Sequence, residues 1–102
     1  MSQDATTLAV TDNPEANRFE AHDGEELVGV IEYSAMPGKI IAMHTEVVPE
    51  REGQGIGSRL VAGMLEQLRA DGRQLQPVCP YVRSYLARHA EWSDVVVPTT
   101  PS

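Results

Sequence analysis

Apolar and polar residues alternate along three segments in the first half of the chain, and this period-two pattern predicts β-strands. The segments span residues 17–21, 26–34 and 39–48. Asp23-Gly24 and Pro37-Gly38 separate them, and both dipeptides are typical of tight turns. Because strands joined by such short turns run antiparallel, the first half predicts a three-stranded antiparallel sheet.

The second half follows a helical period instead. Residues 55–70 place apolar side chains at intervals of three and four, so one stripe of the helix is apolar. Asp71-Gly72 predicts its end, because glycine readily adopts the left-handed cap conformation. Pro80 fits the first turn of a second helix. The expected elements are helices at 55–70 and 80–89 and short strands at 73–78 and 94–97.

The element order β-β-β-α-β-α, with a final short strand, predicts an α/β fold of the compact α+β kind. A strand, a helix and a strand in succession allow a right-handed parallel crossover, so the sheet should be mixed, with helices on its faces. At 102 residues, the chain is expected to form a single domain. We expect residues 1–15 and 98–102 to be flexible ends.

Composition narrows the class of protein. Apolar residues make up 41% of the chain and the formal net charge is −7, which indicates a globular protein whose acidic surface would repel nucleic acid. No apolar run approaches the roughly 20 residues that cross a bilayer, so no membrane partner is expected. The first ten residues do not resemble a secretory signal, and a single cysteine favours a reducing cytoplasm.

A glycine-rich loop between the third strand and the first helix is the clearest functional signal. Gly53, Gly55 and Gly57 alternate there, and a ligand can approach bare backbone closely. The first N–H groups of a helix have no partner within it, and the helix dipole adds positive charge there. The pattern therefore predicts a phosphate or pyrophosphate site. The alternative is a connector in which the glycines serve only backbone conformation.

The run from Val47 to Gly57 reads V-x-P-x-x-x-G-x-G-x-G and precedes an amphipathic helix. It resembles the acetyl-CoA-binding motif of the Gcn5-related N-acetyltransferase superfamily. The sequences His44–Pro49 (HTEVVP) and Pro77–Val82 (PVCPYV) are similar to its small branch of about 100 residues, which is otherwise uncharacterised. The resemblance covers residues 17–92 and implies the compact fold of that superfamily.

The resemblance implies an acetyl-CoA-dependent N-acetyltransferase acting on an exposed amine of an unknown acceptor, as a monomer or weak dimer. It implies a coenzyme A site formed by residues of the strand end, the glycine loop and the second helix. These are Val47, Val48, Glu52, Gly53, Gln54, Gly55, Ile56, Gly57, Ser58, Tyr81 and Tyr85. The chain lacks the two helices that larger relatives insert after their first strand, so the acceptor side should be open.

Two positions depart from the superfamily pattern. Glu52 stands where larger relatives often carry arginine or glutamine, and a carboxylate beside a pyrophosphate is unfavourable. Tyr85 lies one position from the tyrosine that protonates the departing thiolate in larger relatives, since Leu86 aligns there. These departures favour a second hypothesis, a non-catalytic acyl-CoA-binding or interaction module.

Three residues are candidates for catalysis. His44 and Glu46 alternate onto one strand face, where either could accept a proton from the amine, although both could be ordinary strand residues. Cys79 ends the next strand, immediately before a helix. It could accept the acetyl group, protonate the departing thiol or simply pack. The three histidines and one cysteine have no metal-ligand spacing, so no metal site is predicted.

Overall fold

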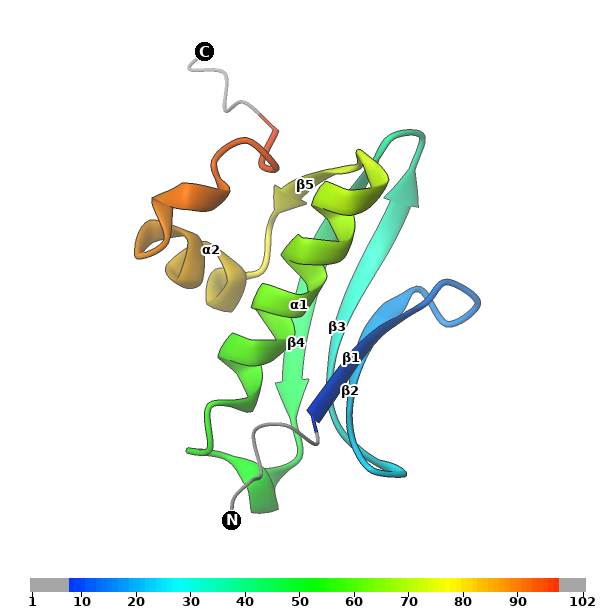
Figure 1. The fold of residues 1–102 in the computed structure, drawn as a ribbon, viewed down its shortest axis with the longest axis vertical. Coiled ribbons are helices and arrows are strands. Elements are labelled where there is room, and N and C mark those ends of the chain that lie inside the picture. The colour runs from blue at the N-terminus through cyan, green and yellow to red at the C-terminus, as the bar shows by residue number, and fades with distance from the viewer. Residues whose placement is uncertain (1–7, 98–102) are drawn as a thin grey trace.

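The computed structural model describes residues 8–97, which form five strands and two helices (Figure 1). The elements are β1 (Leu8–Asn13), β2 (Arg18–Asp23), β3 (Glu26–Met36), β4 (Lys39–Val47), α1 (Ile56–Asp71), β5 (Gln74–Pro77) and α2 (Pro80–Ala87), with 3₁₀ turns at Pro49–Arg51 and Ala90–Trp92. No helix within residues 8–97 has the length and hydrophobicity needed to cross a bilayer.

The strands form one mixed sheet in the order β1-β2-β3-β4-β5. The first four pair antiparallel, and β4 pairs parallel with β5 through the crossover helix α1. The predicted hairpins and the predicted crossover are therefore confirmed. Gly72 caps α1 in the left-handed region at φ 72°, and Pro80 begins α2, as the sequence indicated.

The expectation of a flexible start is wrong for residues 8–13, which form β1. This segment is too short and polar to identify by pattern, and contacts with α1 hold it in place. Gln67 donates a hydrogen bond of 2.7 Å from Nε2 to the carbonyl of Val10. An added Cβ at Gly63 would lie 2.7 Å from that of Val10, so the missing side chain allows the close approach. Residues 1–7 and 98–102 lie outside the described part.

The last predicted strand, at 94–97, is reduced to one parallel bridge between Leu75 and Val96. Two backbone hydrogen bonds support it, from Leu75 N to Val95 O and from Val97 N to Leu75 O, at 2.8 and 2.9 Å. The 3₁₀ turn that ends at Trp92 brings the chain back to β5. The segment therefore extends the sheet edge by a single residue pair.

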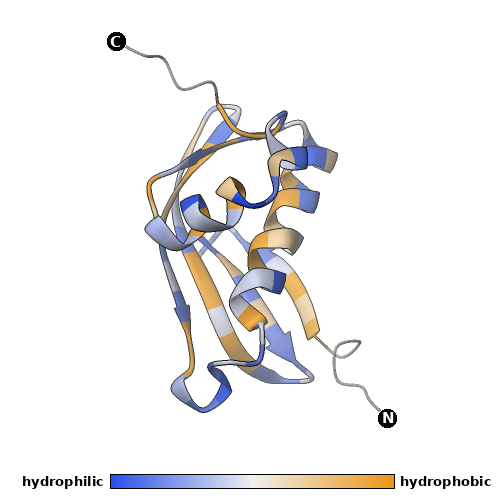
Figure 2. Ribbon diagram, turned by 90° about the vertical axis from the view of Figure 1, so that its left-hand side faces the viewer, coloured by the Kyte–Doolittle hydropathy of each residue, from blue (hydrophilic) through white to orange (hydrophobic). Residues whose placement is uncertain are grey.

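The inner face of the sheet packs against α1, and this interface is the core. The apolar stripe of α1 meets strand residues that are almost fully buried, and Figure 2 shows the hydrophobic positions along both. The strand residues with at most 1% exposure are Phe19, Ala21, Val28, Ile31, Ile40, Ala42 and Leu75. On α1 the fully buried residues are Leu60, Val61, Met64, Leu65 and Leu68.

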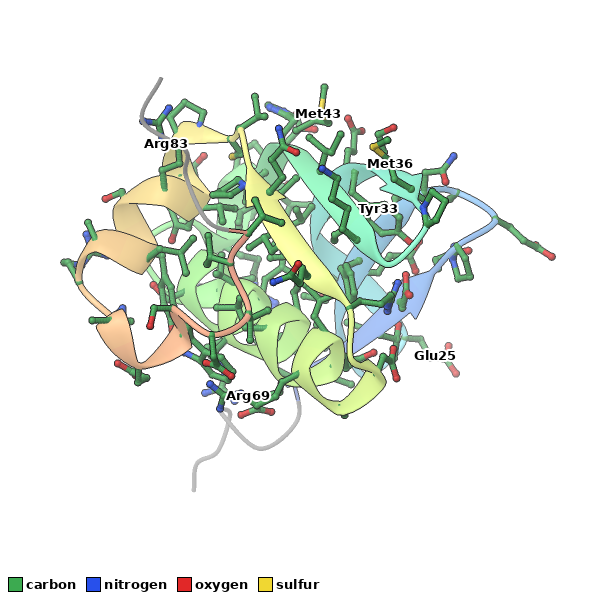
Figure 3. The ribbon with its side chains drawn as sticks, turned by 90° about the horizontal axis from the view of Figure 1, so that it is seen from above. Glu25, Tyr33, Met36, Met43, Arg69 and Arg83 are labelled. Carbon is green, nitrogen blue, oxygen red and sulfur yellow. The ribbon has the colours of Figure 1, made fainter. Side chains whose placement is uncertain are left out.

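The outer face lies on the other side, and no helix covers its β2–β4 part (Figure 3). Its members follow from the strand register, because directly paired residues share a face. One row pairs Arg18, Glu32 and His44, and the next pairs Glu20, Val30 and Glu46. We call these six residues the outer face.

Candidate functional site

A cleft opens where β4 and β5 separate. Their pairing ends at Ala42 and Pro77, and the backbone N–H groups of Val78 and Cys79 both donate to the Ala42 carbonyl, at 3.0 and 2.9 Å. The chain then turns into α2, while β4 continues to Val47. Beyond Ala42, β4 has no neighbouring strand on this side, so its backbone borders the cleft.

A groove of about 440 Å³ lies between the end of β4, the glycine loop and the start of α2. It is lined by Thr45, Val47, Arg51, Glu52, Gly53, Gly55, Ile56, Gly57 and Tyr81. Seven of the predicted coenzyme-binding residues are among these. Val48, Gln54, Ser58 and Tyr85 are not, although Gln54 and Ser58 belong to the same loop and helix start.

The backbone N–H groups of residues 53–58 donate no hydrogen bond within the described part of the chain. The first helical bond comes later, from Arg59 N to the Gly55 carbonyl at 3.1 Å. Glu52 differs, because its N–H donates to the Pro49 carbonyl at 3.3 Å and closes the 3₁₀ turn. A run of donors beside a groove, at the positive end of a 16-residue helix, is suited to an anion.

The three loop glycines serve different needs. Gly53 and Gly55 have φ values of 85° and 78°, a region that side chains rarely adopt. Gly57 is instead required by Tyr81, whose hydroxyl oxygen would lie 2.4 Å from a Cβ at that position. Tyr81 thus lies against the first turn of α1 and forms one wall of the groove.

Arg51 connects the loop to the β2–β3 turn and was not predicted as a site residue. Its guanidinium forms an ion pair with Asp23 through Nη2 and donates from Nε to Gln54 at 3.3 Å. Its Nη1 is buried without a hydrogen-bond partner, and Glu26 approaches it only to 3.9 Å. The contacts with Asp23 and Glu26 join residues that are distant in sequence, so no local sequence pattern would have indicated them.

The residues present fit a diphosphate ligand such as that of coenzyme A. A buried guanidinium nitrogen without a partner is costly, and an anionic oxygen in the groove would satisfy it. The free amides of the glycine loop offer further donors. The carboxylate of Glu52, which also lines the groove, is the one unfavourable element.

Cys79 is 3% exposed, and its Sγ lies 3.3 Å from the Oγ1 of Thr45 across the cleft. Thr45 lines the groove and was missed as a site residue. The sequence could have indicated Thr45, because strand alternation places it on the side of β4 opposite to His44 and Glu46.

His44 and Glu46 lie together on the outer face, as predicted, with Nε2 and Oε1 3.9 Å apart. Both side chains are exposed, at 56% and 71%. A β-bulge at Met43 precedes them: Tyr33 pairs with Ala42, and Glu32 pairs with His44. The three predicted catalytic residues therefore do not converge, since Cys79 faces the groove side of β4 and the other two face the opposite side.

Tyr85 lies away from the groove, in the packing between α2 and the following turn. Its ring stacks on His89 with centroids 3.9 Å apart, and its own exposure is 7%. Burial and the negative charge of Glu91 raise its pKa above the ordinary value of 10.0. In the sequence comparison Leu86, not Tyr85, aligns with the tyrosine of larger relatives. The buried side chain of Tyr85, which does not line the groove, agrees with that offset of one residue.

The family model described as GCN5-related N-acetyl-transferase matches residues 18–95. This chain belongs to that family. The match spans the outer-face strands, the glycine loop and both helices, so it includes the whole groove. Acyl transfer is the reaction of the family, and its members generally use acetyl-CoA.

Solved structures have the same fold. A GCN5-like protein from Staphylococcus aureus is 24% identical, with a TM-score of 0.67 over 93% of each chain. The ribosomal-protein-S18-alanine N-acetyltransferase from Escherichia coli is 16% identical, with a TM-score of 0.54 over 59% of this chain and 39% of that one. At these identities the likeness concerns the fold. No curated protein sequence matches the chain.

Proposed function

We propose that this protein is an acetyl-CoA-dependent N-acetyltransferase that transfers an acetyl group to an exposed amine on a larger acceptor. The observation that carries the proposal is the run of unengaged backbone donors at residues 53–58, which lies beside the groove together with the Nη1 of Arg51, a buried nitrogen without a hydrogen-bond partner. Family membership supplies the reaction class, and these donors supply a place for the coenzyme's diphosphate.

In this proposal the loop amides and Arg51 hold the diphosphate at the loop end of the groove. The end of β4, with Thr45 and Val47, runs along the pantetheine arm toward the cleft at Cys79. Acetyl-CoA, when bound, supplies an activated acetyl thioester. Tyr81 limits the groove on the α2 side.

Transfer forms an N–C bond and breaks the C–S bond, so one proton must leave the amine and one must reach the departing sulfur. His44 takes the amine proton, directly or with Glu46 through water, because both face the side that no helix covers. The thiol of Cys79, held by Thr45 at 3.3 Å, is positioned on the groove side to give a proton to the sulfur. A buried thiol in a hydrogen bond fits this role better than that of a nucleophile.

Binding can be tested with two glycine variants of equal backbone strain. Gly55 and Gly38 have φ values of 78° and 77°, and an added Cβ meets no atom within 4 Å at either. Gly55→Ala and Gly38→Ala should therefore destabilise the protein alike, by about 1 kcal/mol. Only Gly55→Ala should weaken coenzyme A binding, by about tenfold or more in calorimetry. Equal affinity of the two variants for coenzyme A would mean that the glycine loop is not part of the binding site.

Glu52 offers a test in the opposite direction. Replacing it with glutamine removes a negative charge from the groove without changing its shape. We expect Glu52→Gln to tighten coenzyme A binding by about two- to fivefold at low salt, with less effect at high salt. Unchanged affinity at all salt concentrations would mean that the diphosphate lies elsewhere.

A non-catalytic acyl-CoA-binding module is the second candidate. It is favoured by the separation of His44 from Cys79 across β4 and by the packed position of Tyr85. Steady-state release of coenzyme A with lysine peptides distinguishes the two functions. Catalysis predicts that His44→Gln and Cys79→Ala each lower kcat while coenzyme A affinity is kept. Mass spectrometry of the acetyl-CoA-treated protein tests for an acetylated Cys79, which would support the nucleophilic route.

A further inference from the structure

The outer face carries more negative than positive charge. Its carboxylates are Glu20, Glu32 and Glu46, and its one guanidinium, Arg18, is held by Glu20 at 2.8 Å. Glu32 has no partner among the described residues, and Glu46 is only 3.9 Å from the imidazole of His44. Two carboxylates on adjacent strands are therefore available to a cation.

A second groove, of about 270 Å³, lies over these two carboxylates. It is lined by Arg18, Leu27, Gly29, Val30, Glu32, Glu46, Val47, Val48 and Pro49. Val47 lines both grooves, so β4 is the shared wall between them. A ligand in the second groove would approach β4 from the side opposite to the proposed coenzyme.

The same side of the sheet continues past Ser34 to exposed methionines, one of which, Met36, pairs with Lys39. Met36 and Met43 are 46% and 50% exposed and point away from α1 (Figure 3). Met36 lies six residues along β3 from Val30, which pairs with Glu46, so the surface extends for about 20 Å. That length corresponds to about six residues of extended chain. A small monoamine would contact only part of such a surface, whereas an extended chain would contact its whole length.

We propose that the outer face docks the acceptor as an extended, lysine-containing polypeptide segment, with Glu32 and Glu46 as its anionic contacts. This inference rests on the proposed function for the chemistry that follows, but docking itself is a separate property. The charge complementarity selects a cationic segment, and the exposed methionines accept its apolar side chains. The lysine in the groove would lie beside His44.

The test is an NMR titration of the ¹⁵N-labelled full chain with a synthetic peptide of alternating glycine and lysine, capped at both ends. Shifts are expected at amides of β2, β3 and β4 that surround Glu32 and Glu46. The double variant Glu32→Gln/Glu46→Gln should weaken binding by about fivefold or more, because it removes both charge pairs with the lysines of the peptide. A peptide with glutamate in place of lysine should not bind.

The matched control is Glu66→Gln/Glu91→Gln, which removes the same charge from exposed positions on α1 and on the 3₁₀ turn that follows α2. It should leave peptide affinity within about twofold at about 0.15 M salt, since these carboxylates belong to elements that do not form the outer face and salt screens distant charges. An equal loss in both double variants would overturn the proposal, because attraction would then depend on net charge alone. Shifts confined to the helical side would overturn it as well.

Two further results separate this inference from the proposed function. If coenzyme A binds to the wild type and to Glu32→Gln/Glu46→Gln equally while the lysine peptide binds neither, only the docking proposal fails. If the peptide binds and coenzyme A does not, only the proposed function fails. Concentration-dependent dimerisation that broadens the outer-face signals without peptide would mean that a second copy occupies this surface, and would also overturn the docking proposal.

Discussion

The two faces of the sheet use the same strands for different purposes. On the inner face Phe19, Ile31 and Ile40 are at most 1% exposed against α1. On the outer face, one residue along each strand, five of the six side chains are polar or charged, and the groove over Glu32 and Glu46 is open to solvent. Strand alternation thus separates the residues that hold the fold from those free to meet a partner.

Strand β4 shows how this separation is achieved at the candidate site. The bulge at Met43 lets two consecutive residues leave the core, after which Thr45 returns to the helical side. Thr45 then meets Cys79, whereas His44 and Glu46 remain outside. The proposed chemistry therefore lies on two sides of one strand, and the comparison of the two faces can be tested by substitution.

The largest effect is expected from Leu65→Ala on the inner side. Leu65 is fully buried on α1, so the variant removes apolar contacts and leaves a cavity. We expect the free energy of unfolding to fall by about 2–5 kcal/mol in urea titrations. Glu32→Ala on the outer face is the control, and its effect should stay within about 0.5 kcal/mol. Similar losses in both variants would mean that the outer face also holds the fold.

Tyr33 gives a second test of the inner face, through pH. Its hydroxyl donates to Asp12 at 2.6 Å, and burial together with Asp12 raises its pKa from 10.0 to about 12. Unfolded Tyr33 ionises near pH 10 while the folded form keeps its proton, so stability is full below pH 10 and falls between about 10 and 12. Two pKa units set an upper limit of about 2.7 kcal/mol.

Tyr33→Phe should reduce this alkaline slope, measured as unfolding free energy from pH 8 to 11.5, and the slope that remains includes Tyr85, whose pKa is also raised. Tyr81→Phe is the control, because Tyr81 is 45% exposed and its hydroxyl does not contact Asp12. If the wild type and Tyr33→Phe lose stability in parallel as pH rises, ionisation of Tyr33 is not the cause of the alkaline loss.

Much of this arrangement could be predicted from sequence, because it depends on local patterns. Alternation located β2, β3 and β4, and the helical period located α1 to within about a residue at each end. The glycine loop could also be predicted from local sequence, since three alternating glycines around a helix start already indicate free backbone amides. Cys79 was correctly placed between β5 and α2 for the same reason.

The parts that could not be predicted depend on contacts between distant residues. Segment 8–13 becomes a strand because β2 and α1 provide partners for it. The pairing of Arg51 with Asp23 joins positions 28 apart, and no pattern in either segment indicates it. The inward turn of Tyr85 onto His89 likewise depends on how the chain returns after α2.

The smallest effect is expected at Glu20, the one outer-face carboxylate that is buried. Hydrogen bonds from Asn13 and Arg18, at 2.9 and 2.8 Å, lower its pKa below 4.5. Its contribution is present above pH 4.5 and is lost as pH falls through the folded pKa. Glu20→Gln should reduce stability by about 1–2 kcal/mol at pH 7. In acid the two proteins should converge. Glu32→Gln, which loses no hydrogen bond, should track the wild type throughout, and a deficit there like that of Glu20→Gln would contradict the assignment.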